Sequence, residues 1–184
     1  ADHRESIRDH VNSSIKVLTY LKGEVDGGRL GAPQAQEQAK AILRNMREGQ
    51  DGYLFILDKD VRMVMHADQP KLDGKDMTAI TDADGNPLFK ELLAAGLQPG
   101  GGVHTYRWVK PSTGKPAVKE TYMAAFPAWG WVIGSGVYQE DLQAAYMQRV
   151  AIFVPVCLIA AAVLWFVMHS MSQSITTRLS KARD

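Results

Sequence analysis

Three side chains near the middle of the chain have the chemical types that hold a small organic anion. Lys119 is cationic, and Tyr106 and Trp108 are large aromatic residues two positions apart. A pocket for a small carboxylate needs a fixed cation, aromatic walls that exclude water, and a polar group for orientation. An enclosed lysine is expensive unless it is paired, and a bound carboxylate would pair with it. We interpret this stretch as half of a ligand pocket.

Strand periodicity decides which of these side chains can share a face, because residues two apart point the same way. By this rule the residues that point together are Tyr106 with Trp108, Tyr53 with Phe55, and Lys119 with Thr121 and Met123. The lysine and the aromatic residues each also have a simpler explanation that involves no ligand. Lys119 could be a solvated strand lysine, and the aromatic residues could be ordinary core, since aromatic residues favour strands.

The elements that position these residues follow from hydropathy and turn signals. An apolar stripe at helical spacing, formed by Ile7, Val11, Ile15 and Leu18, predicts a helix over residues 1–25. Shorter helices are expected after Pro33 and over 88–95, the latter capped by Gly96. Strands are predicted at 53–58, 61–68, 103–109, 115–126 and 129–138. This order predicts an α+β domain with a long N-terminal helix on a five-stranded antiparallel sheet.

Residues 150–168 are apolar and carry no charge. As a helix rising about 1.5 Å per residue, they could cross the roughly 30 Å hydrocarbon core of a bilayer. A buried core helix is the alternative. Basic residues are more frequent after this segment than before it (Arg149 before; Arg178, Lys181 and Arg183 after), which favours a cytoplasmic C-terminus. Residues 1–148 would then lie outside the membrane.

Composition excludes several functions. The formal net charge is +1, which gives no basic footprint for nucleic acid. The single cysteine, Cys157, permits no disulfide framework within one chain. Motifs of hydrolases, zinc peptidases and phosphate-binding loops are absent. We therefore expect no enzyme, no cofactor and no metal site.

Several short motifs occur together in a characteristic order. They are Gly-Tyr-Leu-Phe at 52–55, His66, Leu-Asp-Gly-Lys-Asp at 72–76, Tyr-Arg-Trp at 106–108 with Lys-Pro at 110–111, Lys119 with Tyr122, and the closing run at 129–138. This set resembles the single Cache domain, an extracytoplasmic sensor with a PAS-like sheet. Ala67 stands where that family commonly has proline after the histidine. Residues 174–179 resemble the start of a HAMP linker, without its usual proline.

The resemblance implies a chemoreceptor of the bacterial inner membrane with a periplasmic sensor domain, which binds acetate, propionate, pyruvate or lactate. Kinases and cyclic-dinucleotide enzymes are the other outputs it implies. It adds His66 and Tyr122 to the candidate ligand-binding residues, which then are Tyr53, Phe55, His66, Tyr106, Trp108, Lys119 and Tyr122. His66 could instead be an ordinary core or surface histidine. Tyr122 is three residues from Lys119, so a regular strand points the two to opposite faces. Either a bulge intervenes or only one lines the pocket, and Lys119 is then preferred.

The predicted organisation has four parts: a helical region (1–48), the sensor core (49–148), a transmembrane helix (149–169) and a HAMP-like linker (170–184). We expect a fragment, with an earlier membrane helix and the cytoplasmic signalling module missing. A homodimer through the N-terminal helix is also expected. The competing hypothesis is a ligand-free interaction module of a receptor or histidine kinase, in which the stripe from Ile7 to Leu18 pairs with a second copy or a periplasmic partner.

Overall fold

The computed structural model describes residues 3–48, 51–139, 155 and 165. The helices and strands discussed below belong to the first of two compact units, Ala1–Glu140. The predicted membrane segment and linker lie outside the described residues, apart from Pro155 and Trp165. Within the part of the chain that is described, no helix is long and apolar enough to cross a bilayer.

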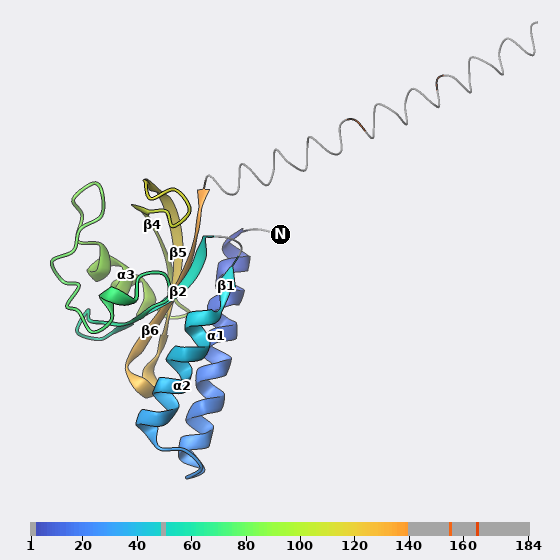
Figure 1. The fold of residues 1–184 in the computed structure, drawn as a ribbon, viewed down its shortest axis with the longest axis vertical. Helices are drawn as coiled ribbons and strands as arrows, with labels where there is room; N and C mark the ends of the chain where they lie inside the picture. Colours follow the sequence, from blue (N-terminus) through green and yellow to red (C-terminus); the bar gives the residue numbers. More distant parts are fainter. Residues whose placement is uncertain (1–2, 49–50, 140–154, 156–164, 166–184) are drawn as a thin grey trace, which may run out of the picture. The chain divides into compact units, whose positions relative to one another are not determined.

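Three α-helices form as the hydropathy pattern predicts (Figure 1). They are α1 (His3–Asp26), α2 (Ala32–Asn45) and α3 (Leu88–Gly96). Pro33 lies in the first turn of α2, where its missing N–H leaves no helical hydrogen bond unmade. The apolar faces of α1 and α2 pack together, and α1 also packs on two strands of the sheet.

The sheet is antiparallel throughout and contains the five predicted strands. These are β2 (Gly52–Asp58), β3 (Met63–His66), β4 (Gly102–Val109), β5 (Pro116–Phe126) and β6 (Trp131–Tyr138). Their order is β2-β6-β5-β4, with β3 and a further strand, β1 (Arg47–Glu48), both on the free edge of β2. The prediction lacked β1 because two residues are too few to show a period. Two short 3₁₀ turns, η1 (Pro70–Leu72) and η2 (Pro127–Trp129), complete the fold.

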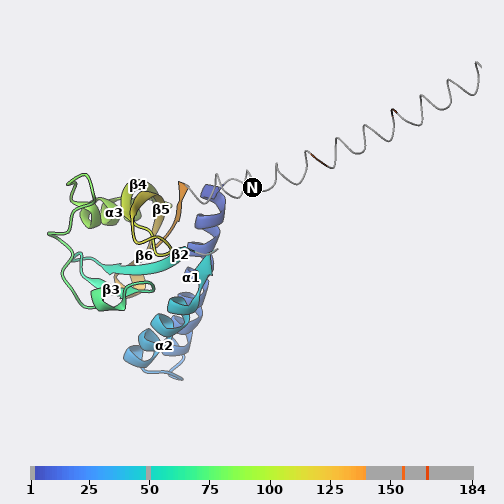
Figure 2. The same ribbon diagram turned by 45° about the horizontal axis from the view of Figure 1, so that its top comes forward.

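The sheet lies between two layers (Figure 2). Helices α1 and α2 cover one face, which we call the helical face, and α3 lies on the other. His10 of α1 reaches Ser135 of β6 through a 2.9 Å contact between Nδ1 and Oγ. Phe89 of α3 packs edge-on against Phe55 on the opposite face. Each layer is therefore tied to the sheet by identified side chains.

Several element boundaries differ from the sequence-based expectation, such as the start of β6 at Trp131 rather than at residue 129, and two of the differences have a clear structural cause. Strand β3 begins at Met63 rather than at residue 61, because Val61 adopts a positive φ of 60° in the turn after β2. Gly96 does not cap α3 but lies inside it, buried against the sheet. A Cβ on Gly96 would lie 2.3 Å from Cγ1 of Val132, so the helix can approach the sheet this closely only with glycine there.

Gly96→Ala should lower the free energy of unfolding by about 1–3 kcal/mol, because the added methyl group forces α3 away from the sheet. Urea denaturation followed by circular dichroism measures the change. Gly23→Ala in α1 is the matched control, since nothing lies within 4 Å of its added Cβ. That change should stabilise the domain by up to about 1 kcal/mol. Equal effects of the two substitutions would contradict the close α3 packing.

The apolar stripe of α1 belongs to the core of its own chain. Ile7, Val11 and Leu18 are fully buried and Ile15 is half-buried. The competing hypothesis is therefore wrong in assigning this stripe to a contact with another chain, and its other part, a ligand-free interaction module, stays a prediction. A dimer through α1 stays a prediction, and it would use the polar outer face of the helix.

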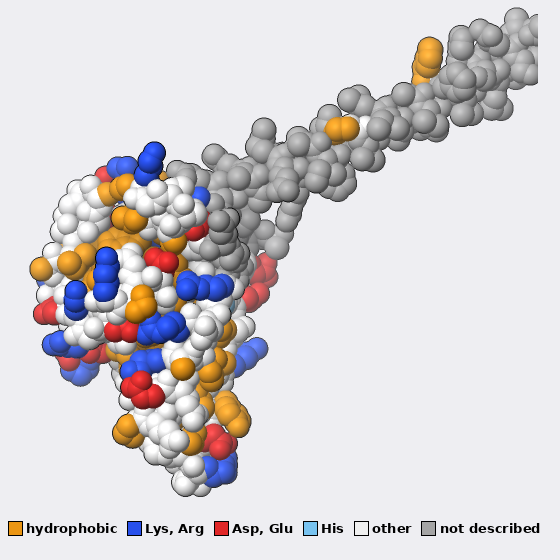
Figure 3. All heavy atoms as spheres, viewed as in Figure 1, with side chains coloured by type: hydrophobic (Ala, Val, Ile, Leu, Met, Phe, Trp, Pro, Cys, Tyr) orange, Lys and Arg blue, Asp and Glu red, His pale blue; other side chains and the backbone are white. Residues whose placement is uncertain are grey.

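Acidic and basic side chains are interspersed on the face shown in Figure 3, with no single field of one sign. Among the described residues some ion pairs lie within a single element, such as Lys40 with Glu37 on α2. Exposed pairs of this kind contribute little to stability. The nearly equal numbers of acidic and basic residues in the chain are thus also evenly mixed on this face.

Candidate ligand-binding site

Strand register brings most of the predicted site residues to one face of the sheet. Tyr106 of β4 lies opposite Lys119 of β5, which lies opposite Tyr138 of β6. Tyr53 of β2 lies opposite Gly136 of β6, which lies opposite Thr121 of β5, so Tyr53 points to the same face as Lys119. Directly paired residues on neighbouring strands point the same way. We call this side, which also carries Phe55 and Trp108 and faces α3, the aromatic face.

Lys119 is the only cation among the described side chains that is completely buried on this face. Its Nζ has no hydrogen-bond partner among the described residues. It lies 3.6 Å from the ring centroid of Tyr53 and 5.3 Å from that of Tyr138. Stacking on aromatic rings compensates a buried ammonium only in part, and its three N–H donors stay unused. The alternative of a solvated strand lysine is wrong.

Burial lowers the pKa of Lys119 from its usual range to about 7, although Asp68 and Asp51 act in the opposite direction. The cause is desolvation, which disfavours the charged form. An anion placed at Nζ would restore the missing partner and raise this pKa. Lys119 is therefore a cation whose charge depends on what lies beside it.

His66, at the end of β3, also reaches the aromatic face. Its ring lies 4.8 Å from the ring of Tyr53 and stacks at 5.9 Å on Phe55, centroid to centroid. Burial and the positive charges of Lys119, Arg44 and Arg47 lower the pKa of His66 to about 3. The ring is thus neutral at physiological pH and can act only as a hydrogen-bonding group.

Tyr106 and Trp108 differ in whether their polar atoms have hydrogen-bond partners. The hydroxyl of Tyr106 lies 3.0 Å from Oγ1 of Thr121 and shares a hydrogen bond with it. Trp108 packs edge-on against Phe89 of α3, but its indole N–H is buried without a partner among the described residues. The aromatic face therefore holds two unpaired buried donors, one on β4 and one on β5. Buried donors are normally paired, so a polar ligand is a physical explanation for both.

Three residues of this face were missing from the prediction, namely Gly136, Tyr138 and Phe89, whereas Thr121 was placed on the face but not among the site residues. A Cβ on Gly136 would lie 2.8 Å from Cε of Lys119, so glycine there lets the lysine side chain cross β6. The alternation Gly134, Gly136, Tyr138 could have revealed one face of β6 by period two. Phe89 carries no such signal, since only tertiary packing brings α3 over the sheet.

Tyr122 lies on the helical face, away from Lys119. The pairing of β4 with β5 runs from Gly102 with Met123 to Val109 with Pro116 without a bulge, so strict alternation holds. Its ring packs under Arg8 of α1, and its hydroxyl donates to the carbonyl of Gly100 at 2.7 Å. The inclusion of Tyr122 is corrected accordingly: the structure does not bring it to the other candidates.

Tyr122→Phe should therefore lower the free energy of unfolding by about 1 kcal/mol, the scale of one hydrogen bond. Affinity for short-chain acids should change less than about twofold, because Tyr122 lies across the sheet from Lys119. Tyr106→Phe makes the same chemical change on the aromatic face and should weaken affinity about fivefold. Calorimetric titration of both variants checks this difference. Equal losses would contradict the assignment of faces.

The hollows described on the surface lie elsewhere, beside α1. One is lined by Ser6, Asp9, His10, Ser13, Met46 and Arg47, and another by Arg4, Glu5, Arg8 and Asp9. Neither contains a predicted site residue. The aromatic face is thus identified as a candidate site by its unpaired donors.

The fold defines an α+β sensory domain of the PAS-like class, with a mixed polar and aromatic site on one face of its sheet. The family model described as single Cache domain 2 matches residues 1–151, and the chain belongs to this family. The predicted resemblance to the single Cache domain is confirmed.

Known proteins extend this likeness. The methyl-accepting chemotaxis protein McpP of Pseudomonas putida is 36% identical over 175 residues, which are 93% of this chain and 32% of McpP. The sensor histidine kinase MctS of Rhizobium johnstonii is 40% identical over 108 residues, 59% of this chain and 23% of MctS. The chain thus spans about a third or less of these relatives. A Cache chemosensory domain solved to explain carboxylic acid recognition is 36% identical, with a TM-score of 0.69 over 73% of this chain and 91% of that one.

Proposed function

We propose that the aromatic face binds a small organic acid of the acetate, propionate, pyruvate or lactate class, with Lys119 pairing to the carboxylate. The observation that carries this proposal is a completely buried ammonium with no hydrogen-bond partner among the described residues. A monocarboxylate would supply the missing acceptor and charge, and the surrounding rings would exclude water from the pair. The solved relative studied for carboxylic acid recognition supports the same chemistry.

Four of the remaining candidates then have a direct role in the proposed site, and Tyr106 would line it with its hydroxyl held by Thr121. Tyr53 and Phe55 would form its apolar wall beside Lys119, and Trp108 would offer its unpaired N–H to a second oxygen or a substituent. His66 would act as a neutral donor that orients the acid. The site would thus combine one charge with several weaker contacts, the composition expected of a small-molecule pocket.

The wider proposal places this domain in a transmembrane receptor with a chemotactic output. Its support is the family, the chemotaxis relative in Pseudomonas putida, and the apolar run at residues 150–168 with basic residues after it. In this arrangement residues 1–148 face the periplasm and the C-terminus enters the cytoplasm through a HAMP-like linker. A homodimer through α1 would join two such receptors.

Calorimetric titration of the whole chain in detergent with acetate, propionate, pyruvate and lactate tests the ligand class. We expect saturable binding of at least one acid with a 1:1 stoichiometry. Benzylamine and a neutral amide of each acid serve as controls and should not bind, since neither supplies a carboxylate. A folded protein that binds none of the four acids would refute the proposal.

A further inference from the structure

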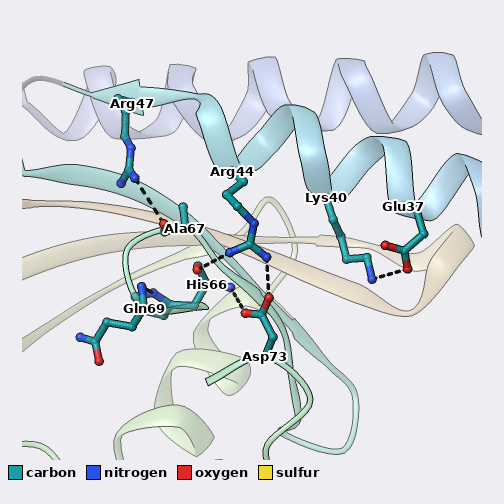
Figure 4. A network of polar contacts seen from close by, with 8 residues as sticks. All are labelled: Glu37, Lys40, Arg44, Arg47, His66, Ala67, Gln69 and Asp73. Carbon is teal, nitrogen blue, oxygen red and sulfur yellow. Dashed lines mark hydrogen bonds and ion pairs between the residues drawn. The ribbon is translucent and has the colours of Figure 1, made fainter. Parts of the chain in front are cut away.

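His66 is held from outside the aromatic face by a closed set of hydrogen bonds (Figure 4). Its backbone N–H donates to Oδ1 of Asp73 at 2.8 Å, and its backbone carbonyl accepts from Nη1 of Arg44 at 2.9 Å. Arg44 and Asp73 are themselves joined by an ion pair between Nη2 and Oδ2. One residue of the candidate site therefore has both of its backbone polar groups bound by a single charged pair.

The two members of this pair come from different parts of the fold. Arg44 lies in the last turn of α2, on the helical side, and Asp73 follows η1 in the loop after β3. Their side chains are each about 30% exposed, so the pair is partly shielded from solvent. Charge-assisted hydrogen bonds that use the Arg fork are stronger and more directional than neutral ones. The pair thus fixes the end of β3 to α2.

The imidazole ring of His66 is held as well. Nδ1 accepts a hydrogen bond from the backbone N–H of Gln69 at 2.9 Å. A neutral ring that accepts at Nδ1 carries its proton at Nε2. Arg47 adds a contact at the next residue, donating from Nη2 to the carbonyl of Ala67 at 3.2 Å. Backbone, ring and tautomer are all set by groups that do not lie on the aromatic face.

We propose that Arg44 and Asp73 are positioning residues, which hold His66 in the orientation that the ligand needs and link the site to α2. The inference rests on the proposed function for its ligand, and adds a physical connection between site and helix. Because α2 packs on α1, a change at His66 reaches the helical layer through this pair. The coupling is reciprocal. If docking of α2 strengthens ligand binding, then ligand binding stabilises the docking of α2 by the same free energy.

The first test is titration of Arg44→Met, Asp73→Asn and the double variant with acetate, propionate, pyruvate and lactate. Each single variant should bind about tenfold more weakly than the wild type, within the usual range of coupling between sites. The double variant should lose no more than about twofold beyond either single variant, because the two residues act as one unit. Additive losses, or unchanged affinities, would overturn the proposal.

Lys40→Met is the matched control, because Lys40 lies one turn earlier on α2 and pairs with Glu37 rather than with the loop after β3 (Figure 4). It removes the same charge from the same helix and should leave affinity unchanged within about twofold. Arg44→Lys keeps the charge without the planar fork and should fall between Arg44→Met and the wild type.

A second readout does not depend on any ligand. In protein labelled with ¹⁵N-histidine, the ring shifts of His66 should report one neutral tautomer with the proton at Nε2, and no titration between pH 5 and 8. Arg44→Met and Asp73→Asn should give a mixture of tautomers, whereas Lys40→Met should not. Unchanged His66 shifts in both variants would overturn the positioning role. If the wild type binds none of the acids but Arg44→Met and Asp73→Asn still change the His66 tautomer as expected, the proposed function is refuted and the positioning role stays supported.

Discussion

Lys119→Met is expected to weaken the affinity for acetate or propionate by more than about tenfold, while it stabilises the unliganded domain. The loss of affinity follows from removing the only completely buried cation among the described residues of the aromatic face. The gain in stability follows because methionine fills a similar volume without an unpaired charge. Replacing buried charged groups by well-packed apolar groups of similar volume is often stabilising, by about 1–4 kcal/mol. Calorimetry and urea denaturation measure the two effects.

The opposite signs make this substitution informative. If Lys119 only supported the fold, its removal would lower the stability of the domain. If it were solvated, its removal would change neither affinity nor stability. Lys115→Met is the matched control, because Lys115 is exposed in the turn before the same strand. It should leave affinity within about twofold of the wild type and the free energy of unfolding within about 0.5 kcal/mol of it. Unchanged affinity in Lys119→Met would remove Lys119 from the site.

Affinity for the same acids should fall steeply as the pH rises above 7. The pKa of Lys119 is about 7 in the unliganded domain, so above that pH only a decreasing fraction of molecules carries the ammonium that the carboxylate needs. The apparent dissociation constant should rise about tenfold per pH unit and about 100-fold by pH 9. The acid itself stays ionised over this range. Titrations at pH 6, 7, 8 and 9 provide the measurement.

Proton uptake gives a direct check of that mechanism. Above pH 7 each bound acid should bring close to one proton to Lys119, and calorimetry in buffers of different ionisation enthalpy detects it. The pKa of His66, about 3, keeps this residue neutral throughout, so it contributes no proton. An affinity that stays constant from pH 6 to 9 would show that the charge on Lys119 plays no part in binding.

The stability of the unliganded domain should rise with pH, whereas the affinity for the acids falls. The folded-state pKa of Lys119 lies below the value of about 10.4 in the unfolded chain, so between these values the unfolded chain binds more protons. The free energy of unfolding should therefore rise as the pH increases from 7 towards 9.5. The full penalty for burying the ammonium is present below pH 7. Lys119→Met should lack this rise.

Period-two alternation was the most reliable guide to the candidate site. It predicted that Tyr106 and Trp108 share a face, as do Tyr53 and Phe55, and the sheet confirms both pairs. It also raised the conflict between Lys119 and Tyr122, and the regular register of β4 with β5 shows that the two side chains lie on opposite faces. Alternation depends only on local backbone geometry, and so it can be read without knowledge of the strand order.

Other features could not be predicted because they depend on contacts between distant parts of the chain. Nothing near Arg44 in the sequence indicates that it binds the backbone of His66, because the two are brought together only when α2 packs beside β3. Gly96 has the sequence context of a helix cap, and its role in close packing depends on Val132 across the interface.

The sequence by itself determined the α+β class, the antiparallel strands, the helical stripe of α1 and the types of side chain that could hold a carboxylate. These follow from periodicities set by the local geometry of helices and strands. Only the tertiary structure decided that Lys119 is completely buried with its Nζ unpaired, that Tyr122 lies on the helical face, and that Arg44 and Asp73 hold His66. Burial and pairing depend on which elements meet, and in this chain residues far apart in sequence supply both.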